Sequence, residues 1–195
     1  GLGIGVENDA PFEFIEEEMD CLLVYGTSIS QGGCATRPGM DYCSILGRMK
    51  NWNVINLGFS GSCKLEREML TIINKIIEER NVKYLLFEVE ANSPSYEHFK
   101  ERFPYFMENL VNRENIKVYL VSHFDEGLVL VDDNLKKFRK GFYKLQKEIA
   151  EKYGVTFIDG KKIIRRLGCE GSVDGVHLTD LGFWEVARQL SKIIK

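Results

Sequence analysis

Short apolar segments alternate with amphipathic segments along the whole chain. The apolar segments are too short for typical helices and predict strands, and the first of them fits a strand buried on both faces. They are Cys21–Tyr25, Asn53–Leu57, Val82–Val89, Ile116–Val121 and Val155–Ile158. This alternation is typical of a parallel sheet with helices on both faces. We therefore expect an α/β fold, a three-layer α/β/α sandwich around a five-stranded parallel sheet in flavodoxin-like order.

Apolar residues at helical spacing predict the helices of the outer layers. These run from about Asp41 to Lys50, Leu65 to Arg80, Tyr96 to Val111, Asp132 to Tyr153 and Thr179 to Ile194. Pro104 should kink the third helix or start a new one. The residues expected to face the core are Tyr42, Ile45, Leu46 and Met49 in the first helix and Leu181, Val186, Leu190 and Ile194 in the last.

The composition is that of an ordinary soluble globular domain. The chain has 195 residues, 44% of them apolar and 28% charged, with a net charge of −3. Such a balance gives no basic surface for nucleic acid or an anionic membrane. The sequence also holds no apolar run long enough to span a bilayer. We expect neither a nucleic-acid partner nor a membrane span.

Five cysteines occur without any Cys-x-x-Cys spacing, at positions 21, 34, 43, 63 and 169. The odd number and the spacing argue against a disulfide framework and against zinc, so we expect reduced thiols and no metal or cofactor. Reduced thiols slightly favour the cytoplasm, and secretion stays an alternative if the chain is part of a larger protein.

The first 19 residues are acidic and show little pattern beyond Phe12-Glu13-Phe14-Ile15, which suggests an edge strand or a linker. We expect residues 1–19 to be a linker or edge segment that follows an absent N-terminal domain. Residues 20–195 then form the single predicted domain.

Polar residues follow the predicted strands at the sheet edge where ligands bind in open α/β folds. Ser28 comes two residues after Gly26, which ends the first strand. A serine there is either a nucleophile or the N-cap of the next helix, and the local sequence favours neither. A nucleophilic serine needs a base and a group that orients the base. His177, with Asp174 three residues earlier, can supply both.

The other two histidines fit the role of base less well. His98 lies among charged residues of a predicted helix and is expected on the surface, while His123 follows a strand with Asp125 nearby and is the competitor. An acyl-transfer site also needs donors for an oxyanion. The Asn92 side chain and the backbone N–H of Gly61 are candidates.

Four separated blocks of this sequence resemble the SGNH, or GDSL-type, hydrolases. They are Gly26-Thr27-Ser28, Asn56-Leu57-Gly58-Phe59-Ser60-Gly61, Glu88-Val89-Glu90-Ala91-Asn92 and Asp174-Gly175-Val176-His177. They span about three quarters of the chain. The resemblance implies a serine esterase with a Ser28–His177–Asp174 triad and no metal, in which the N–H groups of Ser28 and Gly61 and the Asn92 side chain hold the oxyanion.

Two features qualify this resemblance. The first block is usually Gly-Asp-Ser in the family, and Thr27 replaces its aspartate. The run from Gly32 to Met40, GGCATRPGM, resembles a bacterial subgroup whose members often carry an N-terminal β-sandwich domain. Arg37 in this run and Phe59 are candidate substrate contacts, and a solvated arginine and a core phenylalanine are the respective alternatives.

The predicted function is hydrolysis of a carboxylic ester, with an O-acetyl group on a carbohydrate as the favoured substrate. A lipase or thioesterase of the same fold is the nearest alternative. A catalytically silent binding module is another, although no GxGxxG and no Walker lysine is present. Glu88 and Glu90 could suggest glycoside hydrolysis, but they lack an opposing carboxylate.

Overall fold

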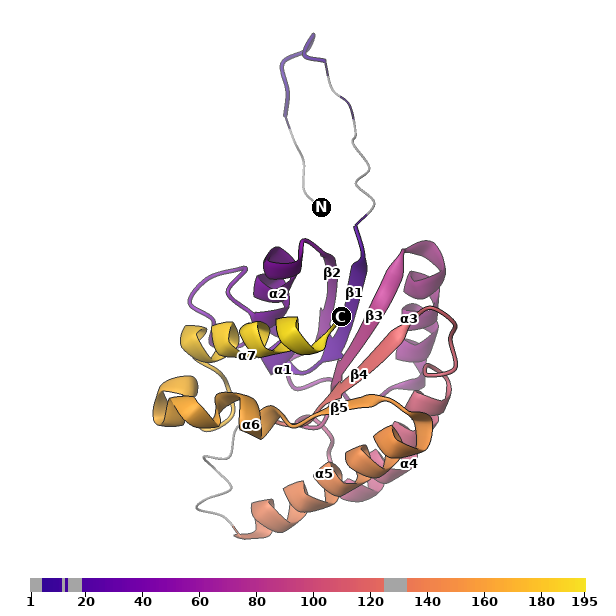
Figure 1. The fold of residues 1–195 in the computed structure, drawn as a ribbon, viewed down its shortest axis with the longest axis vertical. Helices are drawn as coiled ribbons and strands as arrows, with labels where there is room; N and C mark the ends of the chain where they lie inside the picture. The colour runs from indigo at the N-terminus through magenta and orange to yellow at the C-terminus, as the bar shows by residue number, and fades with distance from the viewer. Residues whose placement is uncertain (1–4, 12, 14–18, 125–132) are drawn as a thin grey trace.

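A computed structural model describes residues 5–11, 13, 19–124 and 133–195 of the chain. Its centre is a five-stranded parallel sheet in the order β2-β1-β3-β4-β5 (Figure 1). The strands are β1 (Cys21–Gly26), β2 (Asn53–Gly58), β3 (Val82–Glu88), β4 (Lys117–Val121) and β5 (Thr156–Ile158). This order is the flavodoxin-like one, so the predicted fold class and strand order are confirmed.

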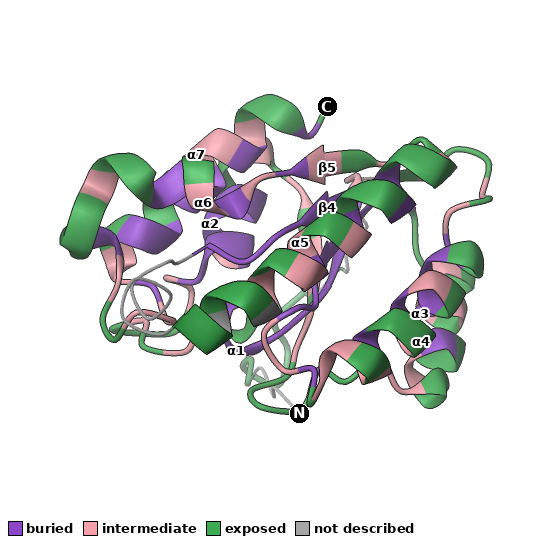
Figure 2. Ribbon diagram, turned by 90° about the horizontal axis from the view of Figure 1, so that it is seen from below, coloured by how far each residue is buried: buried purple, intermediate pink, exposed green. Residues whose placement is uncertain are grey.

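Two layers of helices cover the sheet, as Figures 1 and 2 show. The helices are α1 (Ser28–Gln31), α2 (Tyr42–Lys50), α3 (Arg67–Glu79), α4 (Tyr96–Glu108), α5 (Asp133–Tyr153), α6 (Gly160–Ile164) and α7 (Asp180–Ile193), with a 3₁₀ helix η2 (Arg165–Gly171). The core has two parts because successive side chains of a strand point to opposite faces. Leu23 and Tyr25 of β1 pack with residues of α3, α4 and α5. Leu22 and Val24 pack with residues of α2, α6 and α7.

The sequence missed three short helical elements, α1, α6 and η2, because so few residues show no apolar period. Helix α4 continues through Pro104 as one element. Of the predicted strand or linker at Phe12–Ile15 the structure describes only Glu13, and Asp132, where the longest helix was predicted to begin, lies outside the described residues. No helix in the described ranges combines the length and apolarity needed to cross a membrane.

Two residues predicted to face the core are instead exposed. Leu181 is 48% exposed, because it lies two positions before the buried Phe183 and so points to the opposite side of α7. Met49 is 40% exposed in the last turn of α2. For Met49, helical periodicity gives the direction of the side chain around the axis, but it does not show how far along the helix the core extends.

Candidate active site

The candidate nucleophile lies where β1 runs into the short helix α1. Thr27 is the N-cap of α1, since its hydroxyl accepts the Ile29 N–H at 3.2 Å. Ser28 is therefore the first helical residue, and the interpretation of Ser28 as a cap is wrong. Gly26 permits this tight turn, because a Cβ at Gly26 would lie 2.1 Å from the Ser30 Oγ.

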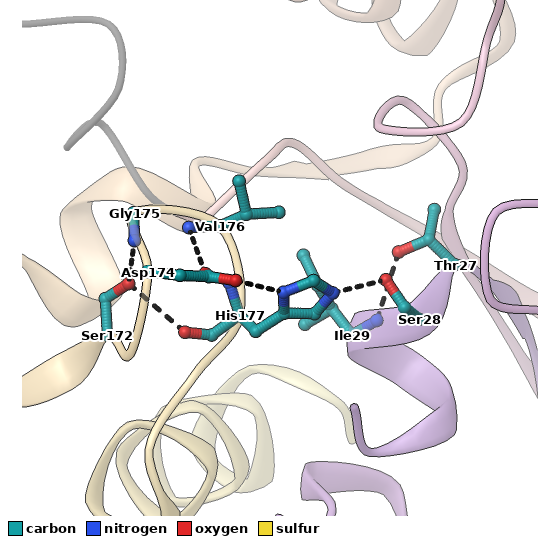
Figure 3. A network of polar contacts seen from close by, with 8 residues as sticks. All are labelled: Thr27, Ser28, Ile29, Ser172, Asp174, Gly175, Val176 and His177. Atoms are coloured by element: carbon teal, nitrogen blue, oxygen red, sulfur yellow. Dashed lines mark hydrogen bonds and ion pairs between the residues drawn. The ribbon is translucent and has the colours of Figure 1, made fainter. Parts of the chain in front are cut away.

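The Ser28 side chain meets a histidine from the far end of the sequence, which in turn meets an aspartate (Figure 3). Ser28 Oγ lies 2.9 Å from His177 Nε2, and His177 Nδ1 lies 2.8 Å from Asp174 Oδ2. The serine itself is only 6% exposed. The structure thus brings together a hydroxyl, an imidazole and a carboxylate in one hydrogen-bonded row, which is the geometry that activates a serine.

The loop before α7 holds the histidine and aspartate through its own hydrogen bonds. Asp174 Oδ1 accepts the backbone N–H groups of Val176 and His177 at 2.9 and 2.7 Å. Ser172 Oγ accepts the N–H of Gly175 at 3.0 Å and donates to the carbonyl oxygen of His177 at 3.1 Å. Gly175 has a φ of +81°, a conformation that glycine adopts without strain. The loop therefore holds Asp174 and His177 in position without the help of a ligand.

These contacts also keep the Asp174 carboxyl ionised. Its partial burial acts to raise the pKa, but the hydrogen bonds from the backbone and side chain of His177 and from the Val176 N–H outweigh burial and lower it. A charged Asp174 favours the tautomer of His177 that carries its proton on Nδ1, which leaves Nε2 as the acceptor for the Ser28 hydroxyl.

A buried carboxyl group lies behind the candidate nucleophile. Glu88 Oε2, from the end of β3, accepts the N–H and hydroxyl of Thr27 at 3.1 and 2.7 Å and the hydroxyl of Ser30 at 3.0 Å. The other carboxyl oxygen of Glu88, Oε1, has no hydrogen-bond partner among the described residues. Burial raises the pKa of Glu88 to about 7, against the effect of those three hydrogen bonds. Sequence reasoning did not identify this anchor of the Thr27–Ser28 turn.

Glu90 has a separate structural environment. It forms an ion pair with Arg139 of α5 at 3.1 Å and accepts a hydrogen bond from Gln146 at 2.8 Å. Both Glu88 and Glu90 are thus engaged by neighbouring side chains within the protein. No contact among the described residues pairs the two carboxylates across a shared cleft, as glycoside hydrolysis requires.

The two candidate oxyanion donors follow β2 and β3. Gly61 is exposed with a φ of +66°, and a Cβ there would meet no atom within 4 Å, so backbone conformation accounts for the glycine. Asn92 Oδ1 accepts the Cys63 N–H at 3.3 Å. Because a backbone N–H only donates, this contact identifies the amide oxygen and directs the Nδ2 group the other way.

The two candidate substrate contacts, Arg37 and Phe59, differ in their exposure. Arg37 is exposed and close enough to Asp180 to lower the pKa of that carboxyl, after the larger effect of two hydrogen bonds from Thr36. Phe59 is 36% exposed and makes an edge contact with Tyr25 at 6.3 Å between ring centroids. Phe59 is therefore neither a fully buried core residue nor a fully exposed one.

The two other histidines do not contact Ser28 within the described part of the chain. His123 is 2% exposed, and burial, followed by the charges of Arg139, Lys161 and His177, lowers its pKa. Its Nδ1 has no partner among the described residues, and its proposed neighbour Asp125 lies outside them. His98 is half-buried rather than fully solvated, and burial lowers its pKa.

One further side chain reaches the candidate site. Ligand atoms of Cys34, Asp174 and His177 all lie within 4.8 Å of one another. Cys34 and Asp174 are exposed and His177 is half-buried. Cys34 is about 140 residues from the other two in sequence, so no spacing motif could have shown the cluster.

With this geometry established, comparison with known proteins decides the family. The family model of the GDSL-like Lipase/Acylhydrolase family matches residues 20–195. The chain belongs to this family. It is accordingly an enzyme, an ester hydrolase of the GDSL/SGNH type, and the resemblance inferred from the four sequence blocks is confirmed. Among curated proteins, none matches the sequence.

Solved structures of GDSL-type proteins share the fold. A protein of Bacteroides ovatus described as a GDSL-like lipase is 27% identical with a TM-score of 0.73, over 89% of this chain and 52% of that one. A two-domain esterase active on acetylated mannans is 17% identical with a TM-score of 0.65, over 89% and 47%. The present chain thus spans about half the length of these two proteins.

A third solved structure matches this chain over most of the length of both proteins. A catalytic mutant of Axe2, an acetylxylan esterase from Geobacillus stearothermophilus, is 14% identical with a TM-score of 0.61. The alignment covers 91% of this chain and 94% of that one. At this identity the likeness shows the common fold alone.

Proposed function

We propose that this protein is a serine esterase that removes O-acetyl groups from a carbohydrate through a Ser28–His177–Asp174 triad. The observation that carries the proposal is the continuous hydrogen-bonded row from Ser28 Oγ through His177 to Asp174, at 2.9 and 2.8 Å. A serine hydroxyl is a weak nucleophile at neutral pH, and an adjacent oriented imidazole is the usual means of activating it.

The reaction follows from the positions of these groups. His177 Nε2 accepts the proton of Ser28 as its Oγ attacks the ester carbonyl carbon, and the Asp174 carboxylate stabilises the imidazolium that forms. The tetrahedral intermediate collapses when His177 returns the proton to the leaving alcohol. Water then attacks the acyl-enzyme by the same route, which releases the carboxylic acid and free Ser28.

The developing oxyanion needs donors that are in place beforehand. We assign this role to the backbone N–H groups of Ser28 and Gly61 and to the Asn92 side chain. The contact from Cys63 to Asn92 Oδ1 supports this assignment, since it engages the amide oxygen and leaves the Nδ2 group as the opposite, donating end of the side chain.

The open setting of the site supports a substrate with a large alcohol part. The Asp174 side chain is 47% exposed and that of His177 is 27% exposed. Gly61, Cys34 and Arg37 are also exposed. A polysaccharide could approach such a rim without a change in the fold, with Arg37 and Phe59 as its proposed contacts. The esterase active on acetylated mannans and the acetylxylan esterase add support by analogy.

We also propose that residues 20–195 form the hydrolase domain, which is the range that the family model matches. Residues 1–19 then lead into it as a linker or edge segment. The greater length of two of the similar proteins is compatible with an upstream domain in the present protein as well.

The test compares hydrolysis of p-nitrophenyl acetate, butyrate and octanoate, an acyl thioester, acetylated xylan and acetylated mannan. The proposal expects the highest kcat/KM for acetate among the aryl esters and release of acetate from at least one polysaccharide. Preference for octanoate would instead identify a lipase, and preference for the thioester a thioesterase. Rates in the Ser28→Ala variant equal to those of the wild type would exclude the proposed nucleophile.

A further inference from the structure

We propose that Cys34, Asp174 and His177 form an inhibitory binding site for a thiophilic divalent cation such as Zn²⁺. Their ligand atoms lie within 4.8 Å of one another. Three ligands on a tetrahedral ion, each about 2.0–2.3 Å from it, are about 3.3–3.6 Å apart. Movements of about 1 Å in exposed side chains therefore suffice to bring the three atoms into coordination.

The combination of ligands selects the kind of ion. A thiolate, an imidazole and a carboxylate together suit Zn²⁺, whereas Mg²⁺ and Ca²⁺ prefer oxygen ligands alone. Three protein ligands leave a fourth position of the ion for water. The site is thus an exchangeable one on the protein surface rather than a closed structural site.

The loop that carries Cys34 is held on both sides of the cysteine. The N–H groups of Gly32 and Gly33 donate to the carbonyl oxygen of Ser28 at 3.0 and 2.7 Å, and Thr36 donates its N–H to Asp180 Oδ1 at 3.0 Å. A Cβ at Gly33 would lie 3.1 Å from His177 Cδ2, which shows how closely this loop passes the imidazole. The fixed backbone keeps the thiol beside the histidine.

An ion coordinated by either ring nitrogen of His177 would stop the proposed reaction. An ion on Nε2 takes the lone pair that accepts the Ser28 proton, and an ion on Nδ1 replaces the hydrogen bond to Asp174 Oδ2. In both cases the histidine can no longer act as an oriented base. Inhibition rests on the proposed function, whereas binding of the ion does not.

A spectroscopic titration tests binding without any need for activity. Co²⁺ coordinated by a thiolate gives a charge-transfer absorption band in the near ultraviolet. We expect this band in the wild type and in Cys169→Ser, which removes an exposed cysteine of η2, and we expect its loss in Cys34→Ser. Absence of the band in the wild type, or its persistence in Cys34→Ser, would overturn the proposal.

An activity assay then tests inhibition. Zn²⁺ should inhibit ester hydrolysis by the wild type and by Cys169→Ser, EDTA should restore the rate, and Mg²⁺ should have no effect. Loss of a ligand-supporting group typically costs 10–100-fold in metal affinity, so loss of Cys34 itself should raise the half-inhibitory Zn²⁺ concentration at least about tenfold. Equal inhibition of Cys34→Ser and wild type would contradict the site. If no ester is hydrolysed, the esterase proposal fails while the cobalt result still decides the metal site.

Discussion

Thr27 donates both its backbone N–H and its hydroxyl to the carboxyl group of Glu88, at 3.1 and 2.7 Å. The turn that presents Ser28 is thereby fastened to the end of the neighbouring strand β3. The GDSL-type family usually has an aspartate at the position of Thr27. In the present protein the acidic group at this turn is supplied by Glu88 from β3, and the residue before the serine is the donor.

Replacing Thr27 with valine should destabilise the protein. Thr27→Val removes the hydroxyl that donates to Glu88 and that caps α1 through the Ile29 N–H. From typical values for a buried hydrogen bond to an acidic group and for an N-cap, we expect a loss of about 2–4 kcal/mol in the free energy of unfolding. Urea denaturation measures it. Thr27→Ser keeps the hydroxyl and is the control, and equal losses in both variants would contradict this role.

The raised pKa of Glu88 predicts a dependence of stability on pH. With a pKa of about 7 in the folded protein and an ordinary value of 4.5, Glu88 binds its proton more tightly in the folded state. The free energy of unfolding should therefore fall as the pH rises from about 4.5 to 7, by about 3 kcal/mol from this group.

A Glu88→Gln variant isolates this contribution, because glutamine does not titrate and all other groups are shared. Relative to this variant, the wild type should lose stability between about pH 4.5 and pH 7, as measured by urea denaturation. A difference between the two proteins that stays constant over this range would show that Glu88 does not titrate there.

Asn92 should stabilise the transition state more than it stabilises the bound substrate. Loss of one oxyanion donor typically lowers kcat about 10²–10³-fold, so Asn92→Ala should show such a loss with a small change in KM. Because Asn92 also accepts the Cys63 N–H, unfolding must be measured in parallel. Asn92→Asp is the matched control, since it keeps an acceptor for Cys63 and removes the donor. Full activity in Asn92→Asp would exclude the oxyanion role.

The Asp174 carboxylate should be needed for the orientation and charge of His177. Asp174→Asn preserves the shape of the side chain but lets its amide donate to Nδ1, which favours the wrong tautomer of the imidazole and should lower kcat up to about 10⁴-fold. Steady-state kinetics with p-nitrophenyl acetate measures this loss. A reduction smaller than tenfold would mean that the 2.8 Å contact to His177 serves the loop rather than the reaction.

The fold followed from the sequence because the central strands have an unmistakable pattern. Cys21 to Tyr25 are all apolar and all at most 4% exposed. The burial of both faces of β1 is therefore visible in the sequence as a run of consecutive apolar residues. The prediction for Met49 was wrong because its burial depends on where the core ends along α2, and that for Leu181 because this residue points to the opposite side of α7 from the buried Phe183. Helix α1 has four residues, too few for a periodic pattern.

The candidate site was predictable to the extent that its residues follow strands or precede a helix. Ser28, Asp174 and His177 could be selected in this way, because strand ends meet at one edge of the sheet. The hydrogen bonds of Thr27 to Glu88 and the proximity of Cys34 to His177 join residues that are distant in sequence, and neither pair forms a motif. Only the folded arrangement brings these pairs together.

Covalent labelling of the protein shows whether His177 activates Ser28 as a nucleophile. The protein is incubated with a serine-directed fluorophosphonate, and the adduct is located by mass spectrometry of its peptides. If His177 activates Ser28, we expect a single adduct on Ser28 in the wild type, no adduct in Ser28→Ala, and strongly slowed labelling of Ser28 in His177→Ala. An adduct on a different residue, no adduct on the folded wild type, or equally fast labelling in His177→Ala would contradict it.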